Sequence, residues 1–174
     1  QVQLIGSHGH TVFHDPINGY TSQLGDGATV AATTGINTVS DLRAMDIALG
    51  GQGAPIVPAG EKLLFPETKA FLNLGGIANI SLHGNDSIIA YDICPANRVL
   101  NALAEKAGKS FDDGGTLAST GFLRDEVLAK INALEYYSLP HPKSLDNSFG
   151  LEVVLPLITG ANLSIPDALR TMVE

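Results

Sequence analysis

The chain has 174 residues, enough for one domain or two small lobes, and 44% of them are hydrophobic, an ordinary share for a soluble protein with a packed core. Its formal net charge is −8 at pH 7, and its 10 Lys and Arg residues are scattered along the chain. This argues against binding to nucleic acid or to an anionic membrane, because both need clustered basic residues. The single cysteine, Cys94, excludes an intrachain disulfide and a zinc site built from several cysteines. A reducing compartment fits this composition, and we expect a cytoplasmic location.

The first residues already have the pattern of a strand, at Val2 to Ile5, with no initiating Met and no charged and apolar leader before it. No apolar stretch reaches the length of a membrane span. We therefore expect a sequence that begins inside a fold.

The front part of the chain combines short strands, turns and weak helices. A strand at 1–6 enters a loop of Gly, Ser, His and Thr at 6–11. The expected elements after it are a turn at 15–19, a strand at 20–24, a helix at 28–34 closed by Gly35, a strand at 37–40, a helix at 41–49, a glycine loop at 50–55 and a helix at 57–65.

The back part predicts an antiparallel β-meander followed by helices, with a boundary between the two parts near 61–69. The expected strands are 70–74, 79–83 and 87–91, the last ending at Asp92. A helix follows, with Val99, Leu100, Leu103 and Ala107 on one face and a stop at Gly108. The later elements are a loop at 112–121, a long amphipathic helix at 122–136 with Phe122, Val127, Leu128, Ile131 and Leu134 inward, a loop at 139–147, and helices at 151–158 and 165–173.

Gly75 and Gly76 lie at the first bend of the meander. Two adjacent glycines let backbone N–H groups approach an anion such as a nucleotide phosphate, because no Cβ intervenes. A plain glycine bulge in a hairpin explains the same pair equally well. The bend is not a Walker loop, since no Gly-Lys-Ser/Thr follows it.

Asp92 follows an apolar strand and precedes a helix, at the kind of sheet edge where α/β proteins bind substrates. A carboxylate there can act as a general base. By local pattern alone, a turn or helix-capping aspartate is the commoner case.

The front part holds two further polar groups. His8, His10 and His14 are spaced so that His8 and His10 would share one face of a strand, a pattern that suggests metal binding. No carboxylate or cysteine is placed to complete such a site. We therefore favour hydrogen bonding of a substrate by His8, with His10 and His14 at the surface and no metal held by side chains. Arg43, between Asp41 and Asp46, is suited to clamping an anion or to a solvated charged face.

Taken together, these segments resemble one family, the anhydro-N-acetylmuramic acid kinases of the sugar kinase/Hsp70/actin superfamily. The order and spacing agree from residue 1 to residue 122, and beyond that the likeness is limited to helices and Pro142–Ser144. The stretches that match are Gly6–Thr11, Ser40–Arg43 with Asp46, Gly50–Pro58, Leu72–Asn79 and, more loosely, Tyr91–Asp92 with Pro95 and Asn97.

The resemblance implies an α/β fold, a fragment of the two-lobed ribonuclease H-like (actin-like ATPase) fold. Residues 1–65 would end the first lobe and residues 66–174 would begin the second. It also implies a kinase that opens the 1,6-anhydro ring of anhydro-N-acetylmuramic acid with water and transfers the γ-phosphate of ATP to O6, in cell-wall sugar recycling. In that assignment Asp92 is the catalytic base, Gly75, Gly76 and Asn79 face the nucleotide, and Ser7, His8, Gly9, Arg43, Asp46 and Asn97 face the sugar.

The chain departs from the family at three positions, where Cys94 and Ala96 replace glycines and His10 replaces glutamine. If those glycines are needed for positive φ or close approach, the turn after Asp92 is altered. The family's N-terminal phosphate loop and C-terminal adenosine segment do not occur among these residues, so we expect ATP and Mg²⁺ to serve the full-length enzyme and the fragment alone to bind neither and to be inactive.

Two alternatives stay open at this point. One is a non-catalytic sugar-binding or interaction module on the kinase scaffold, and the other is a chaperone-like nucleotide switch of the same superfamily. The expected partners are a small amino sugar and ATP. An apolar face left uncovered would favour self-association, so a homodimer is one option.

Overall fold

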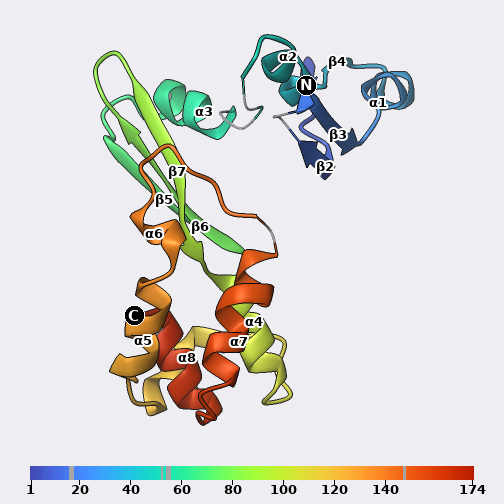
Figure 1. Cartoon of the computed structure of the whole chain (residues 1–174). Coiled ribbons are helices and arrows are strands. Elements are labelled where there is room, and N and C mark those ends of the chain that lie inside the picture. Colours follow the sequence, from blue (N-terminus) through green and yellow to red (C-terminus); the bar gives the residue numbers. More distant parts are fainter. Residues whose placement is uncertain (16–17, 52, 54–55, 147) are drawn as a thin grey trace. The chain divides into compact units, whose positions relative to one another are not determined.

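The structure is a computed structural model that describes residues 1–15, 18–51, 53, 56–146 and 148–174 (Figure 1). It divides into two compact units, Gln1–Pro66 and Glu67–Glu174, each with its own strands and helices. Pro16 and Ile17 of the predicted turn, and Gln52, Ala54 and Pro55 of the predicted glycine loop, lie outside the described residues. Within the described part, no helix has both the length and the apolar character to cross a membrane.

The described residues of the first unit form two small two-stranded sheets. Strand β1 (Leu4–Gly6) pairs in parallel with β4 (Asn37–Val39), and β2 (His10–Asp15) pairs antiparallel with β3 (Tyr20–Leu24). The loop predicted to follow Gly6 is therefore shorter than expected, because β2 begins at His10. Phe13 and Tyr20 pack across the hairpin with ring centroids 5.1 Å apart, and this contact favours the extended strand over a loop.

The described part of the first unit also contains the helices α1 (Gly27–Thr34), α2 (Leu42–Ala48) and α3 (Ile56–Leu64). Helix α1 begins where the Asp26 carboxylate accepts the amide of Thr29 at 2.7 Å, and it ends at Gly35 in the left-handed conformation. The predicted helix and its glycine stop are confirmed here.

The second unit opens with an antiparallel sheet in the order β5 (Ala70–Leu74), β6 (Ile77–His83) and β7 (Ile88–Pro95). The predicted meander is confirmed, but its last strand does not end at Asp92. Strand β7 continues to Pro95, with Asn79 paired to Asp92 and Ala78 paired to Cys94. Ile93 is thus the extra residue of a β-bulge immediately after Asp92.

The described helices of this unit are α4 (Asn97–Glu105), α5 (Asp125–Asn132), α6 (Glu135–Ser138), the π-helical segment η4 (Gly150–Val154), which leads into α7 (Leu155–Thr159), and α8 (Ile165–Val173), with short 3₁₀ turns η2 (Asp113–Gly115) and η3 (Ala118–Thr120). Helices α4, α5, α7 and α8 gather at one end of the sheet (Figure 1), and their buried side chains, with those of η3 and η4, form one apolar core. The core consists of Val99, Leu103, Ala118, Val127, Ile131, Val154, Ile158, Ala168 and Leu169.

The single long helix predicted at 122–136 is wrong. Helix α5 spans only Asp125–Asn132, the backbone at Leu134 is extended, and Phe122 is 72% exposed. The start is non-helical because the Phe122 amide donates to the Asp167 carboxylate at 2.8 Å, and the Arg124 amide donates to the Thr171 hydroxyl at 3.1 Å. These bonds to α8 replace the hydrogen bonds of a first helical turn.

Candidate functional site

The residues predicted to bind substrate fall into two groups, one in each unit. Ser7, His8, Gly9, Arg43 and Asp46 belong to the first unit, where the first three lie between β1 and β2 and the last two lie on α2. Asn97 belongs to the second unit, together with the predicted nucleotide residues and Asp92.

In the first unit, Arg43 Nε donates a hydrogen bond to His8 Nε2 at 3.1 Å. Arginine has no acceptor atom, so His8 Nε2 must be the unprotonated nitrogen. His8 Nδ1 then carries the hydrogen and donates it to the carbonyl oxygen of Gly9 at 2.9 Å. The structure thus brings His8 and Arg43 together and fixes a neutral His8 in one tautomer.

Gly9 and Asp46 have clear structural roles in the same unit. Gly9 has a φ of +68°, and a Cβ there would meet the carbonyl oxygen of Leu24. Asp46 Oδ2 accepts the backbone amide of Gly53 at 2.6 Å. At least one oxygen of Asp46 is therefore used to hold the turn that follows α2.

The glycine pair of the second unit is joined to the beginning of α4. The carbonyl oxygen of Gly76 accepts the amide of Ala96 at 2.9 Å, and that of Gly75 accepts the amide of Asn97 at 3.1 Å. The Asn97 side chain donates to the carbonyl oxygen of Leu74 at 3.0 Å. These bonds position the bend between β5 and β6 against the N-terminal turn of α4.

The fold itself does not require glycine at either position of this pair. Neither residue has positive φ, and a Cβ would come no closer than 3.4 Å to the protein at Gly75 and 3.7 Å at Gly76. The nearest atom to a Cβ on Gly76 is Nε of Arg98. An open backbone surface beside a guanidinium fits an anionic group such as a phosphate. Sequence reasoning missed Arg98, although it directly follows Asn97.

Cys94 and Ala96, which stand where the family has glycines, adopt no left-handed conformation. The only non-glycine residues with positive φ in the described ranges are Asp41 and Asn162. Cys94 lies in β7, and Ala96 precedes α4 with a φ of −130°. The backbone therefore does not require positive φ at Cys94 or Ala96.

A row of three polar residues crosses the sheet of the second unit. Asn73 on β5 pairs with Asn79 on β6, and Asn79 pairs with Asp92 on β7. Directly paired residues of an antiparallel sheet project from the same face. Sequence reasoning missed Asn73, although the alternation in Leu72–Leu74 shows a polar residue facing away from two leucines.

Asp92 is half-buried, and its two carboxylate oxygens differ. Oδ2 accepts the amide of Leu145 at 2.8 Å, whereas Oδ1 accepts no hydrogen bond from the described residues. Burial raises the pKa of Asp92 above its ordinary value, and the Leu145 amide opposes this rise. A carboxylate with one fixed oxygen, one available oxygen and a raised pKa is suited to accepting a proton.

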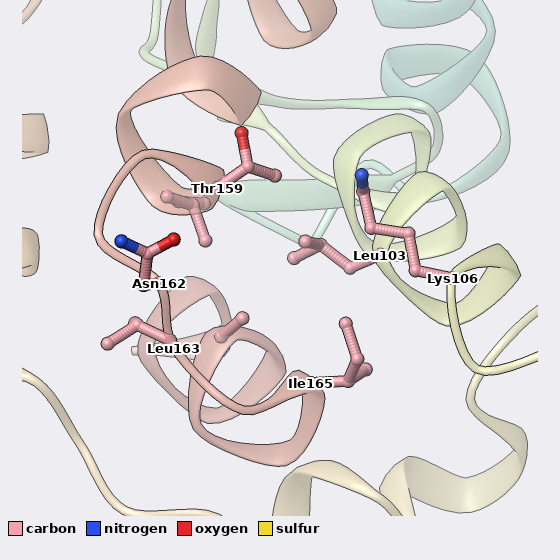
Figure 2. A pocket seen from close by; sticks show the side chains of 8 residues that line it. Leu103, Lys106, Thr159, Asn162, Leu163 and Ile165 are labelled. Carbon is pink, nitrogen blue, oxygen red and sulfur yellow. The ribbon is translucent and has the colours of Figure 1, made fainter.

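A hollow of about 310 Å³ in the second unit lies elsewhere, among α4, α7 and α8. Figure 2 shows Lys106 and Asn162 on opposite sides of it. Its lining contains none of the predicted site residues. Nor do the described ranges bring three or more His, Cys, Asp or Glu side chains together as a metal site.

The sequence of this chain is similar to those of one family of known proteins. The sequence model of anhydro-N-acetylmuramic acid kinase matches residues 1–174. The anhydro-N-acetylmuramic acid kinase of Aliivibrio fischeri is 43% identical over 181 residues, covering 99% of this chain and 49% of the relative. The same kinase of Vibrio parahaemolyticus is 40% identical, covering 100% of this chain and 49% of the relative. That of Saccharophagus degradans is 41% identical, covering 100% of this chain and 50% of the relative. The chain spans about half the length of the curated relatives it matches.

Proposed function

The chain belongs to the anhydro-N-acetylmuramic acid kinase family, and we propose that it contributes the catalytic base and part of both substrate sites to an ATP-dependent kinase of full family length. In that kinase, residues 1–65 end the first lobe and residues 66–174 begin the second lobe of an actin-like fold. The division of the chain into units of residues 1–66 and 67–174 is compatible with this assignment.

The proposed reaction joins ring opening to phosphoryl transfer. Water attacks C1 of 1,6-anhydro-N-acetylmuramic acid, the bond between C1 and O6 breaks, and O6 forms a bond to the γ-phosphorus of ATP while ADP leaves. Asp92 takes the proton that the water loses. The observation that carries this role is the half-buried Asp92 carboxylate, which has Oδ2 fixed by Leu145 and Oδ1 without a bond to the described residues.

On the nucleotide side, Gly75, Gly76 and Asn79 are the proposed contacts, joined by Arg98. The support is the open backbone surface at the glycine pair and the guanidinium beside it. ATP supplies the phosphoryl group, and Mg²⁺ neutralises charge on its phosphates. In the full-length kinase, Mg²⁺ would be held largely by the phosphates of ATP.

On the sugar side, the proposed contacts are the His8–Arg43 pair with Ser7, Gly9 and Asp46, and Asn97 of the second unit. The neutral His8 and the cationic Arg43 suit a sugar that carries both hydroxyl groups and a carboxylate. The structural bonds of Asp46 and Asn97 leave each of them further polar atoms for a ligand.

Asp92→Asn in the full-length kinase tests the proposal, with Asp86→Asn as the matched control because Asp86 is exposed in the turn between β6 and β7. We expect sugar-dependent ADP release to fall about 10²- to 10⁴-fold for Asp92→Asn and to stay unchanged for Asp86→Asn. Sugar affinity, measured by calorimetry, should change little in either variant. If the unmodified protein binds the sugar but releases no ADP, the alternative of a non-catalytic sugar-binding module replaces the kinase.

We also propose that the 174 residues alone do not turn over ATP, because they correspond to about half of each relative. Sugar-dependent ADP release by the purified 174-residue chain would contradict this.

A further inference from the structure

Three hydrogen bonds from one later segment converge on Asp92. The Tyr136 hydroxyl donates to the carbonyl oxygen of Asp92 at 2.6 Å. The Asp92 amide donates to the carbonyl oxygen of Lys143 at 3.0 Å, and the Leu145 amide donates to Asp92 Oδ2 at 2.8 Å. Residues 139–145, which we call the strap, together with α6 thus bond to the amide, the carbonyl and the carboxylate of one residue.

The position of Asp92 in the sheet explains why this support is needed. Strand β7 is an edge strand, so a row of its backbone groups faces away from β6. The bulge at Ile93 interrupts the pairing immediately after Asp92. The bonds from Tyr136 and the strap replace those of a further strand at this point. The side chain of Asp92 is consequently fixed from outside the sheet.

Tyr136 is itself firmly held. It is 8% exposed, and its ring packs against that of Phe149 with centroids 5.6 Å apart. Lys143 Nζ donates to the carbonyl oxygen of Tyr136 at 2.9 Å and lies 4.6 Å from its ring centroid. A tyrosine fixed both by ring packing and by a nearby cation has a hydroxyl of defined position.

We propose that Tyr136 is a positioning residue for Asp92: with the strap it fixes the backbone and Oδ2 of the base, so that Oδ1 alone is directed to the water of the reaction. This inference rests on the proposed function. The fixed geometry matters because a misplaced base loses rate even when the substrate still binds.

Tyr136→Phe in the full-length kinase tests the proposal, with Tyr137→Phe as the matched control. The Tyr137 side chain neighbours Tyr136, but its hydroxyl makes no hydrogen bond with the described residues. We expect Tyr136→Phe to lower kcat about tenfold with an unchanged KM, and Tyr137→Phe to lower neither. Rates are compared at equal folded fraction, measured by circular dichroism at the assay temperature.

The pH profile of kcat gives a second readout, because a loss of folded protein at acidic pH cannot move the acidic limb of the profile to lower pH. A looser strap has two opposite effects on the pKa of Asp92. Water that reaches the carboxylate lowers this pKa, and a weaker hydrogen bond from the Leu145 amide raises it. Because burial is the larger effect, we expect the acidic limb of the profile to move to lower pH in Tyr136→Phe only. The titratable groups around Asp92 are Tyr91 and Cys94 on β7, Tyr136 and Tyr137 on α6, and His141 and Lys143 in the strap.

The outcomes separate this inference from the proposed function. If Asp92→Asn abolishes activity while Tyr136→Phe behaves like Tyr137→Phe in both kcat and pH profile, Asp92 is the base and the positioning role is wrong. If Asp92→Asn keeps full activity, the proposed function of Asp92 fails whatever Tyr136→Phe does.

Discussion

Asn79 on β6 lies directly opposite Asp92 on β7, and the pairing of the two strands shifts immediately after this pair. The amide and carbonyl of Asp92 bond to the strap and Tyr136 rather than to β6. The pair is therefore of the non-hydrogen-bonded kind, in which side chains lie closest together. Two half-buried polar side chains beside a bulge break the regular pattern of a strand, and such departures are expected at functional sites.

We first predict that the 174-residue chain is more stable with Asp92→Asn than with aspartate at pH 7. Folding raises the pKa of Asp92 mainly through burial. Stability from this carboxyl group is thus fully present below its ordinary pKa and is lost as the pH rises through the window between the ordinary and raised values. Asparagine has no such loss. Urea unfolding should give a higher midpoint for Asp92→Asn at pH 7 and no gain at pH 3. Asp86→Asn is the control, and a lower midpoint for Asp92→Asn at pH 7 would contradict the prediction.

Sequence patterns predicted the elements that depend on local signals. The meander follows from short apolar strands with glycine turns, the end of α1 from Gly35, and the start of α8 from Pro166 in its first turn. In each case the determining residues are within a few positions of the element.

Features that depend on distant contacts could not be predicted in this way. The hydrogen bond between Tyr136 and Asp92 joins residues 44 positions apart, and the bond between Phe122 and Asp167 joins residues 45 positions apart. The first supports the candidate base, and the second prevents a helix that the amphipathic pattern favours. The placement of Arg98 beside the glycine pair likewise depends on how α4 meets the sheet.

Leu103→Ala should strongly destabilise the second unit. Leu103 on α4 is 1% exposed in the apolar core, so the substitution removes buried methyl groups and leaves a cavity. We expect a loss of about 2–5 kcal/mol in the free energy of unfolding. Leu72→Ala, at a 57% exposed position on β5, should change it by less than about 0.5 kcal/mol. Urea titration followed by circular dichroism compares the two, and equal losses would show that the core is not where the structure has it.

Gly121→Ala should also destabilise, for a different reason. The φ of Gly121 is ordinary, but a Cβ there would overlap the carbonyl group of Pro166 at the beginning of α8. Because the obstacle is backbone, we expect a loss of about 1–3 kcal/mol. Gly60→Ala on α3 meets no atom within 4 Å and should instead stabilise its helix by about 1 kcal/mol. Thermal unfolding of both variants measures the difference, and a neutral Gly121→Ala would mean that α8 packs less closely than described.

The contact between Arg43 and His8 leads to a prediction that needs no activity. With Arg43 Nε donating to Nε2 at 3.1 Å, His8 must carry its hydrogen on Nδ1, where the Gly9 carbonyl oxygen accepts it. Nitrogen-15 NMR of the 174-residue chain at neutral pH should therefore show His8 in the Nδ1–H form. Arg43→Ala removes the donor and should let the Nε2–H form appear, whereas Arg170→Ala, at a partly exposed arginine of the other unit that pairs with Glu174, should leave the His8 signals unchanged. A dominant Nε2–H form in the unmodified chain would show that Arg43 does not donate to His8. The two side chains would then not form the pair that is proposed to bind the sugar.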